Sequence, residues 1–189
     1  DIQDGLYNYQ MNLNGQIKTT VDDINKIVKD IAELNDKIVY HEMNGDHAND
    51  FRDSRNLLLD KLSSYLDITV KESANGSVNI IAHGHELLAH NAANTLGLKY
   101  SAAGYAFVEP VFSKSEDILS ADDDSAISLF GDLTKENLNG GSQNCCGLLK
   151  SLLVSRGNTI GKYDTPESEV NNYLIPNVQK KFDNLVNGI

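Results

Sequence analysis

The sequence predicts an α+β fold in which both chain ends form an antiparallel helical bundle or coiled coil and a mainly antiparallel β domain is inserted between them. Apolar residues recur at helical spacing in the first forty residues, alternate with polar residues after residue 67, and return to helical spacing after residue 141. We therefore expect a helical part at 1–66, a β-rich domain at 67–140 and a second helical part at 141–189.

The first helical part carries an apolar stripe whose positions step alternately by about four and three residues. The positions of the stripe are Ile17, Val21, Ile24, Val28, Ile31, Asn35 and Ile38. A polar residue such as Asn35 at this kind of position restricts the register or the number of partner helices at a cost in stability. We expect this stripe to serve helix packing and assembly.

A second, shorter helix should begin at Asn49 or Asp50, which are good N-terminal capping residues, and end near residue 66. The β domain should open with a hairpin that turns at Asn75-Gly76, a dipeptide favoured in tight turns. Further short strands are expected at 81–82, 86–89, 96–100, 105–112 and 127–130. Pro110 places its strand at an edge or a bend, because proline cannot donate to the ladder.

The chain returns to helices after residue 141, and its last helix repeats an apolar stripe that includes Val178, Phe182 and Leu185. Pro176 should kink or restart this helix. We expect these three stripe residues to take part in helix packing and assembly as well. The simplest arrangement packs the two chain ends antiparallel, with the β domain projecting from one end of the bundle.

The composition argues against several classes of function. The formal net charge is −11 and no basic stripe is present, which disfavours nucleic acid as a partner. No apolar run is long enough to span a bilayer, so we expect no membrane segment. Cys145 and Cys146 are adjacent and cannot close the long loops that make disulfides stabilising, so we expect ordinary thiols. A vicinal disulfide and half of a metal site are the alternatives.

The sequence contains no motif that predicts catalysis, a cofactor or a metal. The segment 85–90, His-Glu-Leu-Leu-Ala-His, resembles the zinc-protease helix signature, but its second histidine comes one residue too late to share a helix face with the first. A metal held by His83, His85 and a distant carboxylate is an alternative. The acidic triplet 122–124 lacks the ligand spacing of a calcium loop and should be a solvated turn.

Several stretches of the sequence resemble the flagellar hook-associated protein 1 family. They are 31–38 (IAELNDKI), 49–63 (NDFRDSRNLLLDKLS), 147–156 (GLLKSLLVSR), and Ile175-Pro176 with 182–185 (FDNL). Together these stretches bracket nearly the whole chain. The sequence departs from the family pattern at Asn56 and Gly157, where aspartate is usual.

The resemblance implies a structural subunit of the bacterial flagellum that forms the hook-filament junction by helix-mediated self-assembly, without a catalytic site or cofactor. The implied partners are other copies of the chain, the hook protein, and neighbouring hook-associated protein or flagellin subunits, with an export chaperone as a further candidate. The implied location is extracellular, reached through the flagellar type III export apparatus, and the chain would be a central fragment without the terminal segments. The alternatives are another flagellin-like hook-associated protein, a metal-dependent hydrolase using His83, His85 and His90, and a surface adhesin.

Overall fold

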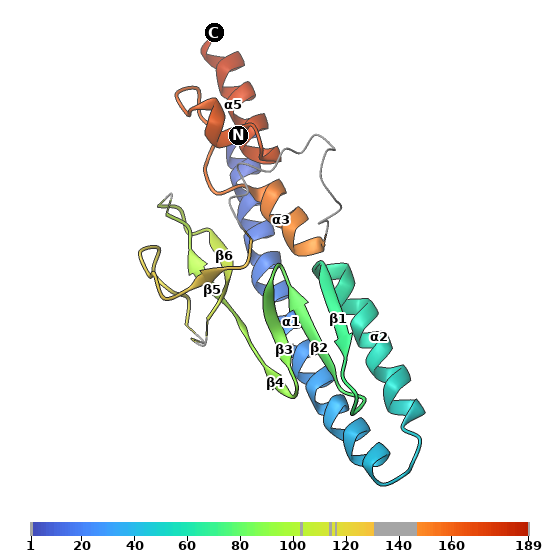
Figure 1. The fold of residues 1–189 in the computed structure, drawn as a ribbon. Coiled ribbons are helices and arrows are strands. Elements are labelled where there is room, and N and C mark those ends of the chain that lie inside the picture. Colours follow the sequence, from blue (N-terminus) through green and yellow to red (C-terminus); the bar gives the residue numbers. More distant parts are fainter. Residues whose placement is uncertain (1, 103, 114, 116, 131–146, 189) are drawn as a thin grey trace.

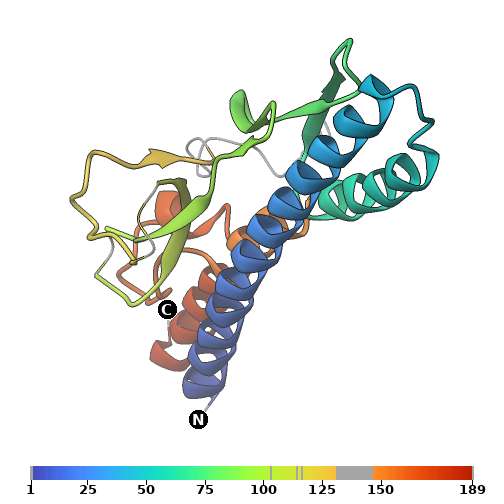
Figure 2. The ribbon, with the colours of Figure 1, turned by 90° about the horizontal axis from the view of Figure 1, so that it is seen from below.

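A long helix, α1 (Ile2–Met43), forms the spine of the molecule (Figure 1). The computed structural model describes residues 2–188 except 103, 114, 116 and 131–146. The other helices are α2 (Asn49–Tyr65), α3 (Leu148–Arg156), the short α4 (Glu167–Val170) and α5 (Leu174–Asn187). α2 turns back along the C-terminal half of α1, whereas α3 and α5 lie against its N-terminal half (Figures 1 and 2). Both chain ends therefore belong to one helical bundle, as predicted.

Two antiparallel sheets occupy the chain between α2 and the later helices. Sheet A has the order β1-β2-β3-β4 and consists of β1 (Ile68–Glu72), β2 (Val78–Ala82), β3 (His85–Ala89) and β4 (Ala92–Ala93). Sheet B has the order β5-β6-β7 and consists of β5 (Leu96–Tyr100), β6 (Val108–Phe112) and β7 (Ile127–Ser128). The predicted hairpin is confirmed: β1 pairs with β2, and Gly76 in the connecting turn has a φ of 84°.

One hydrophobic core cluster joins the helices to both sheets. It contains Ile24 and Ile31 of α1, Ile80 of sheet A, Val108 of sheet B and Leu149 of α3. The expectation that the β domain projects from one end of the bundle is wrong, because both sheets lie along α1 (Figure 1). A sheet with an apolar face must bury that face against another layer, and here the long helix provides the layer.

Some local details also differ from the predicted ones. α2 begins at Asn49 with the buried Ala48 at the cap position, and no side chain caps it. Pro110 lies in β6, the middle strand of sheet B, rather than at an edge. The ladder tolerates it because β7 is only two residues long and the Pro110 carbonyl still accepts a hydrogen bond from the Leu129 amide at 3.2 Å. The predicted restart of the helix near Pro176 is confirmed: α4 ends at Val170 and α5 begins at Leu174, so Pro176 lies in the first turn, where its missing amide has no helical partner to lose.

Candidate assembly surface

The apolar stripe predicted on the first helix lies inside the chain. Each of its members is at most 2% exposed: Ile17, Val21, Ile24, Val28, Ile31, Asn35 and Ile38. α1 packs against α2, α3 and both sheets, so the stripe serves internal packing in this structure. That the same residues also take part in contacts between subunits stays a prediction.

Asn35 bonds to a strand and to a buried arginine. Its Oδ1 accepts hydrogen bonds from the Val78 amide at 3.0 Å and from Arg55 Nη1 at 3.1 Å. Its Nδ2 donates to the carbonyls of Val78 at 2.9 Å and His90 at 3.0 Å. The register that Asn35 specifies here is that of β2 against α1.

The apolar stripe of α5 lies on the surface. Val178 is 45% exposed, Leu185 is 76% exposed, and Phe182 is partly exposed. Leu174, one helical turn before Val178, is 60% exposed. α5 turns Ile175 and Gln179 toward the rest of the chain instead. The three predicted residues of this helix therefore share a stripe that the chain itself leaves largely uncovered.

Buried amide groups hold α5 against α1. Gln179 is 0% exposed, and its Nε2 donates to Gln10 Oε1 at 2.9 Å while its Oε1 accepts from the Gly161 amide at 3.0 Å. Gln10 Nε2 in turn donates to the Arg156 carbonyl at 2.7 Å. Gln3 Nε2 donates to the Gln179 carbonyl at 3.2 Å, which places the two chain ends side by side. We did not predict from the sequence that these glutamines would be buried between the helices. The signal that could have indicated it is their position next to the apolar stripes.

The first turns of α1 add apolar groups to the same end of the molecule, where Ile2 is 59% and Tyr9 is 55% exposed. We use the name end surface for the apolar residues at this end of the two helices that are at least 45% exposed, together with the partly exposed Phe182: Ile2, Tyr9, Leu174, Val178, Phe182, Leu185 and Val186. These residues belong to two helices that lie side by side at this end of the molecule (Figure 1). Large exposed apolar patches are typical of surfaces that pack against another protein.

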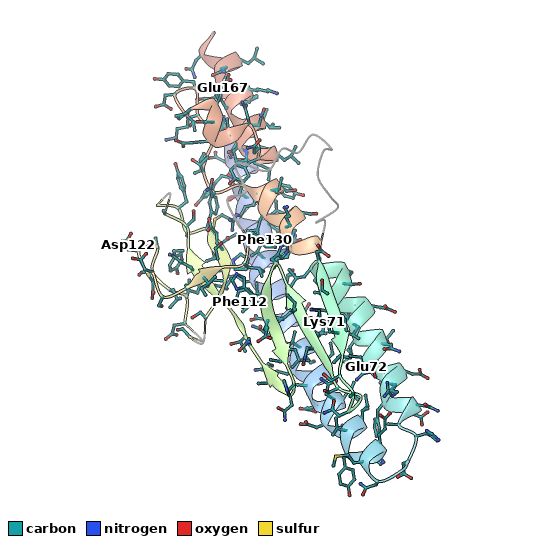
Figure 3. The ribbon with its side chains drawn as sticks, in the orientation of Figure 1. Lys71, Glu72, Phe112, Asp122, Phe130 and Glu167 are labelled. Atoms are coloured by element: carbon teal, nitrogen blue, oxygen red, sulfur yellow. The ribbon has the colours of Figure 1, made fainter. Side chains whose placement is uncertain are left out.

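The opposite end of the molecule is held by an ion-pair cluster, which we call the Arg52 clamp. Arg52 of α2 donates to Glu42 of α1 at 2.6 and 2.9 Å and to Glu72 of β1 at 2.6 Å. Figure 3 shows Glu72 on β1 beside α2. The hydrogen bonds from Arg52 lower the pKa of Glu42, and those to both carboxylates raise the pKa of Arg52. The clamp ties α1, α2 and β1 together.

The histidines considered as metal ligands pack against aromatic rings. The His83 and Phe130 ring centroids are 4.7 Å apart, and those of His85 and Phe112 are 5.1 Å apart. The segment around His85 is a strand, not a helix. Across the described part of the chain, no three His, Cys, Asp or Glu side chains come together as a metal site would require.

The acidic triplet lies on the loop at the outer side of sheet B, where Figure 3 labels Asp122 away from α1. Asp123 Oδ1 accepts hydrogen bonds from the amide and the hydroxyl of Ser125, which lower the pKa of the Asp123 carboxyl. Cys145 and Cys146 lie outside the described residues. None of the described helices has a stretch both long and apolar enough to cross a bilayer.

These features define a structural class: a helical scaffold with docked β-hairpins, polar networks used for packing, and an apolar surface at the end where the chain termini meet. Comparison with known proteins then gives the family. Residues 1–145 match the family model described as the flagellar hook-associated protein FlgK helical domain. The chain belongs to this family, which confirms the resemblance drawn from the sequence.

Two relatives illustrate the match. The chain is 40% identical over 75 residues to flagellar hook-associated protein 1 of Bacillus subtilis (strain 168). The matched segment makes up 40% of this chain and 15% of that protein. The structure of the flagellar hook junction protein FlgK from Burkholderia pseudomallei matches with a TM-score of 0.53 at 25% identity, covering 58% of this chain and 19% of that one. The chain thus spans less than a fifth of the length of either relative.

Proposed function

We propose that this chain is a structural segment of the hook-filament junction of the bacterial flagellum, and that it packs against other helices through the end surface. The observation that carries the proposal is the exposed stripe on α5, from 45% exposure at Val178 to 76% at Leu185. Burying one large apolar side chain contributes roughly 1.5–3 kcal/mol. Covering several of them would be enough to favour helix pairing.

The family supports the location and the kind of role. One relative bears the name flagellar hook-associated protein 1, and the other is called a flagellar hook junction protein. We infer that the partners are copies of this chain, the hook protein and neighbouring hook-associated protein or flagellin subunits, with an export chaperone as a further partner before assembly. The role requires no catalysis, and the route to the cell exterior would be the flagellar type III export apparatus.

We also infer a division into a helical part at 1–66, an inserted β-rich part at 67–140 and a helical part at 141–189. The strands of the described chain fall between Ile68 and Ser128, which supports the first boundary. α3 begins at Leu148, which is compatible with the second, although residues 131–146 lie outside the described part.

The test is a substitution on the end surface. Val178→Asp and Leu185→Asp, introduced together into the gene that encodes this chain, should abolish filament attachment and swimming in a strain lacking the wild-type gene. A charge placed in an apolar helix contact costs several kcal/mol because its water is removed without compensation. Full rescue of swimming by the double variant would refute the proposed role of the end surface.

Leu57→Asp is the matched control. Leu57 is 71% exposed, similar to Leu185, but it lies on α2 rather than on the end surface. We expect this variant to swim normally. Circular dichroism of the purified chains should show the same helix content for all variants, which separates a lost contact from a lost fold.

A further inference from the structure

Two arginines are buried in the interior, one in each of two segments that carry the family resemblance. Arg55 of α2 is 2% exposed and Arg156 of α3 is 1% exposed. Burial lowers the pKa of both, that of Arg156 to about 10. Keeping a cation in such a place is unfavourable unless its donors are matched by well-placed acceptors. Neither side chain belongs to the end surface, so their burial needs a separate explanation.

Arg156 is part of a polar contact between α3, α1 and sheet B. Its Nη1 donates to Asn14 Oδ1 at 2.6 Å and to the Val108 carbonyl at 2.6 Å. Asn14 Oδ1 also accepts from the Val108 amide at 3.0 Å, and its Nδ2 donates to the Ala106 carbonyl at 3.0 Å. The guanidinium stacks over Phe107, with its central carbon 5.0 Å from the ring centroid. The start of β6 is thereby fixed to two helices at once.

Arg55 makes a similar arrangement at sheet A, where its Nη2 also lies 3.9 Å from Glu72 Oε1 and its buried Nε has no hydrogen-bond partner among the described residues. Its Nη1 donates to Asn35 Oδ1 at 3.1 Å and to the Gly76 carbonyl at 2.6 Å. Asn35 holds both the amide and the carbonyl of Val78, the first residue of β2. In both places an asparagine of α1 bonds to the backbone at the start of a strand, and a buried arginine from a second helix bonds to that asparagine and to a nearby carbonyl.

A third asparagine of α1 provides a comparison. Asn25 Nδ2 donates to the Leu96 carbonyl at 2.8 Å, and Asn25 Oδ1 accepts from the Leu96 amide at 2.8 Å. This contact uses the same backbone groups, but the hydrogen bonds of the described chain place no arginine on it. The arginine is therefore an addition at Asn14 and Asn35 rather than a requirement of the asparagine contact.

We propose that the Asn14–Arg156 and Asn35–Arg55 pairs are two separate latches, the first holding sheet B and the second holding sheet A to α1, so that either sheet can open while the other stays closed. Each latch joins α1 to one sheet and one further helix. In each latch the asparagine Oδ1 accepts hydrogen bonds both from the arginine and from a strand amide. Opening a latch therefore exposes the buried cation and the strand backbone groups at the same time. The sheets are thus held by discrete contacts in addition to the common apolar core.

The test is native-state amide hydrogen exchange on the 189-residue chain, with Arg156→Met and Arg55→Met compared to wild type. Methionine keeps an unbranched apolar stem but loses the charge and the donors, and it leaves the asparagine contact to the strand in place. We expect Arg156→Met to accelerate exchange in the β5–β6 ladder about tenfold or more and that in the β1–β2 ladder less than about threefold. Arg55→Met should produce the reverse pattern.

Asn25→Ala is the control, because it removes an asparagine contact that has no arginine. Leu96 is the first residue of β5 and pairs with Phe112, whereas Val108 pairs with Tyr100 at the opposite end of the same ladder. The effect of Asn25→Ala should therefore be confined to the Leu96 end of the β5–β6 ladder and leave the Val108 end as slow as in wild type. If either methionine variant does not fold, replacement of the same arginine by lysine gives the same comparison with a smaller expected rise in the same sheet. An equal rise in both sheets for both variants would show one cooperative unit and overturn the proposal, as would no rise in either sheet.

Discussion

Gly161 provides a sharp test of how α5 is seated. A Cβ added there would lie 1.8 Å from the Pro176 carbonyl oxygen, whereas real Cβ atoms essentially never come closer than 3.0 Å to such an atom. It would also lie 2.9 Å from the Lys180 amide nitrogen. Both neighbours are backbone atoms and cannot rotate away. Gly161→Ala must therefore increase the separation between the backbone at residue 161 and α5 by about 1.2 Å, the difference between 3.0 and 1.8 Å.

The cost has two parts. Overpacking of this kind costs roughly 1–3 kcal/mol. The shift also breaks the hydrogen bond from the Gly161 amide to Gln179 Oε1, and a buried donor left without an acceptor costs roughly another 1–3 kcal/mol. We expect Gly161→Ala to lower the free energy of unfolding by about 2–6 kcal/mol, the sum of the two parts.

Urea unfolding followed by circular dichroism measures this change. Gly15→Ala is the control, since the Cβ at this helical position meets nothing within 4 Å. Alanine is the better helix former, so the control should raise the free energy of unfolding by up to about 1 kcal/mol. If Gly161→Ala proved as stable as wild type, the close packing of the 157–161 loop against α5 would be refuted.

Two further predictions concern the core and the Arg52 clamp. Ile31 is 0% exposed, so Ile31→Ala should cost about 2–5 kcal/mol in urea unfolding; a loss under about 1 kcal/mol would contradict its place in the core. The pKa of Glu42 is lowered in the folded chain, so its contribution to stability is present above its ordinary value of 4.5 and is lost as the pH falls through the lower folded value. Glu42→Gln should therefore flatten the acid side of the melting-temperature profile, and parallel profiles for the two proteins would contradict this.

The sequence predicted the elements well wherever periodicity was strong. The helical spacing around Ile24 and the alternation around Ile80 depend on local packing, and the corresponding helix and strand are present. The change from helical spacing to alternation and back also predicted the α+β fold class. Periodicity could not predict which element packs against each apolar helix or strand face. A stripe such as that of α1 is apolar whether a helix or a sheet covers it, so the position of the sheets along α1 was missed.

The polar contacts were harder to predict for a different reason. Asn14, Asn25 and Asn35 bond mainly to backbone atoms of distant strands, and any residue type there presents the same amide and carbonyl. The sequence therefore contains no complementary side chain that would indicate the contact. The burial of Arg55 was missed because arginine on an amphipathic helix is usually exposed.

The two ends of the molecule should respond differently to ionic strength. The Arg52 clamp consists of partly exposed charges, whose attraction weakens as added salt screens them. Gln10 and Gln179 join α1 to α5 through neutral, buried amides that dissolved ions do not screen. In concentrated salt the junction of α1, α2 and β1 would loosen first, while the end that carries the chain termini kept its shape.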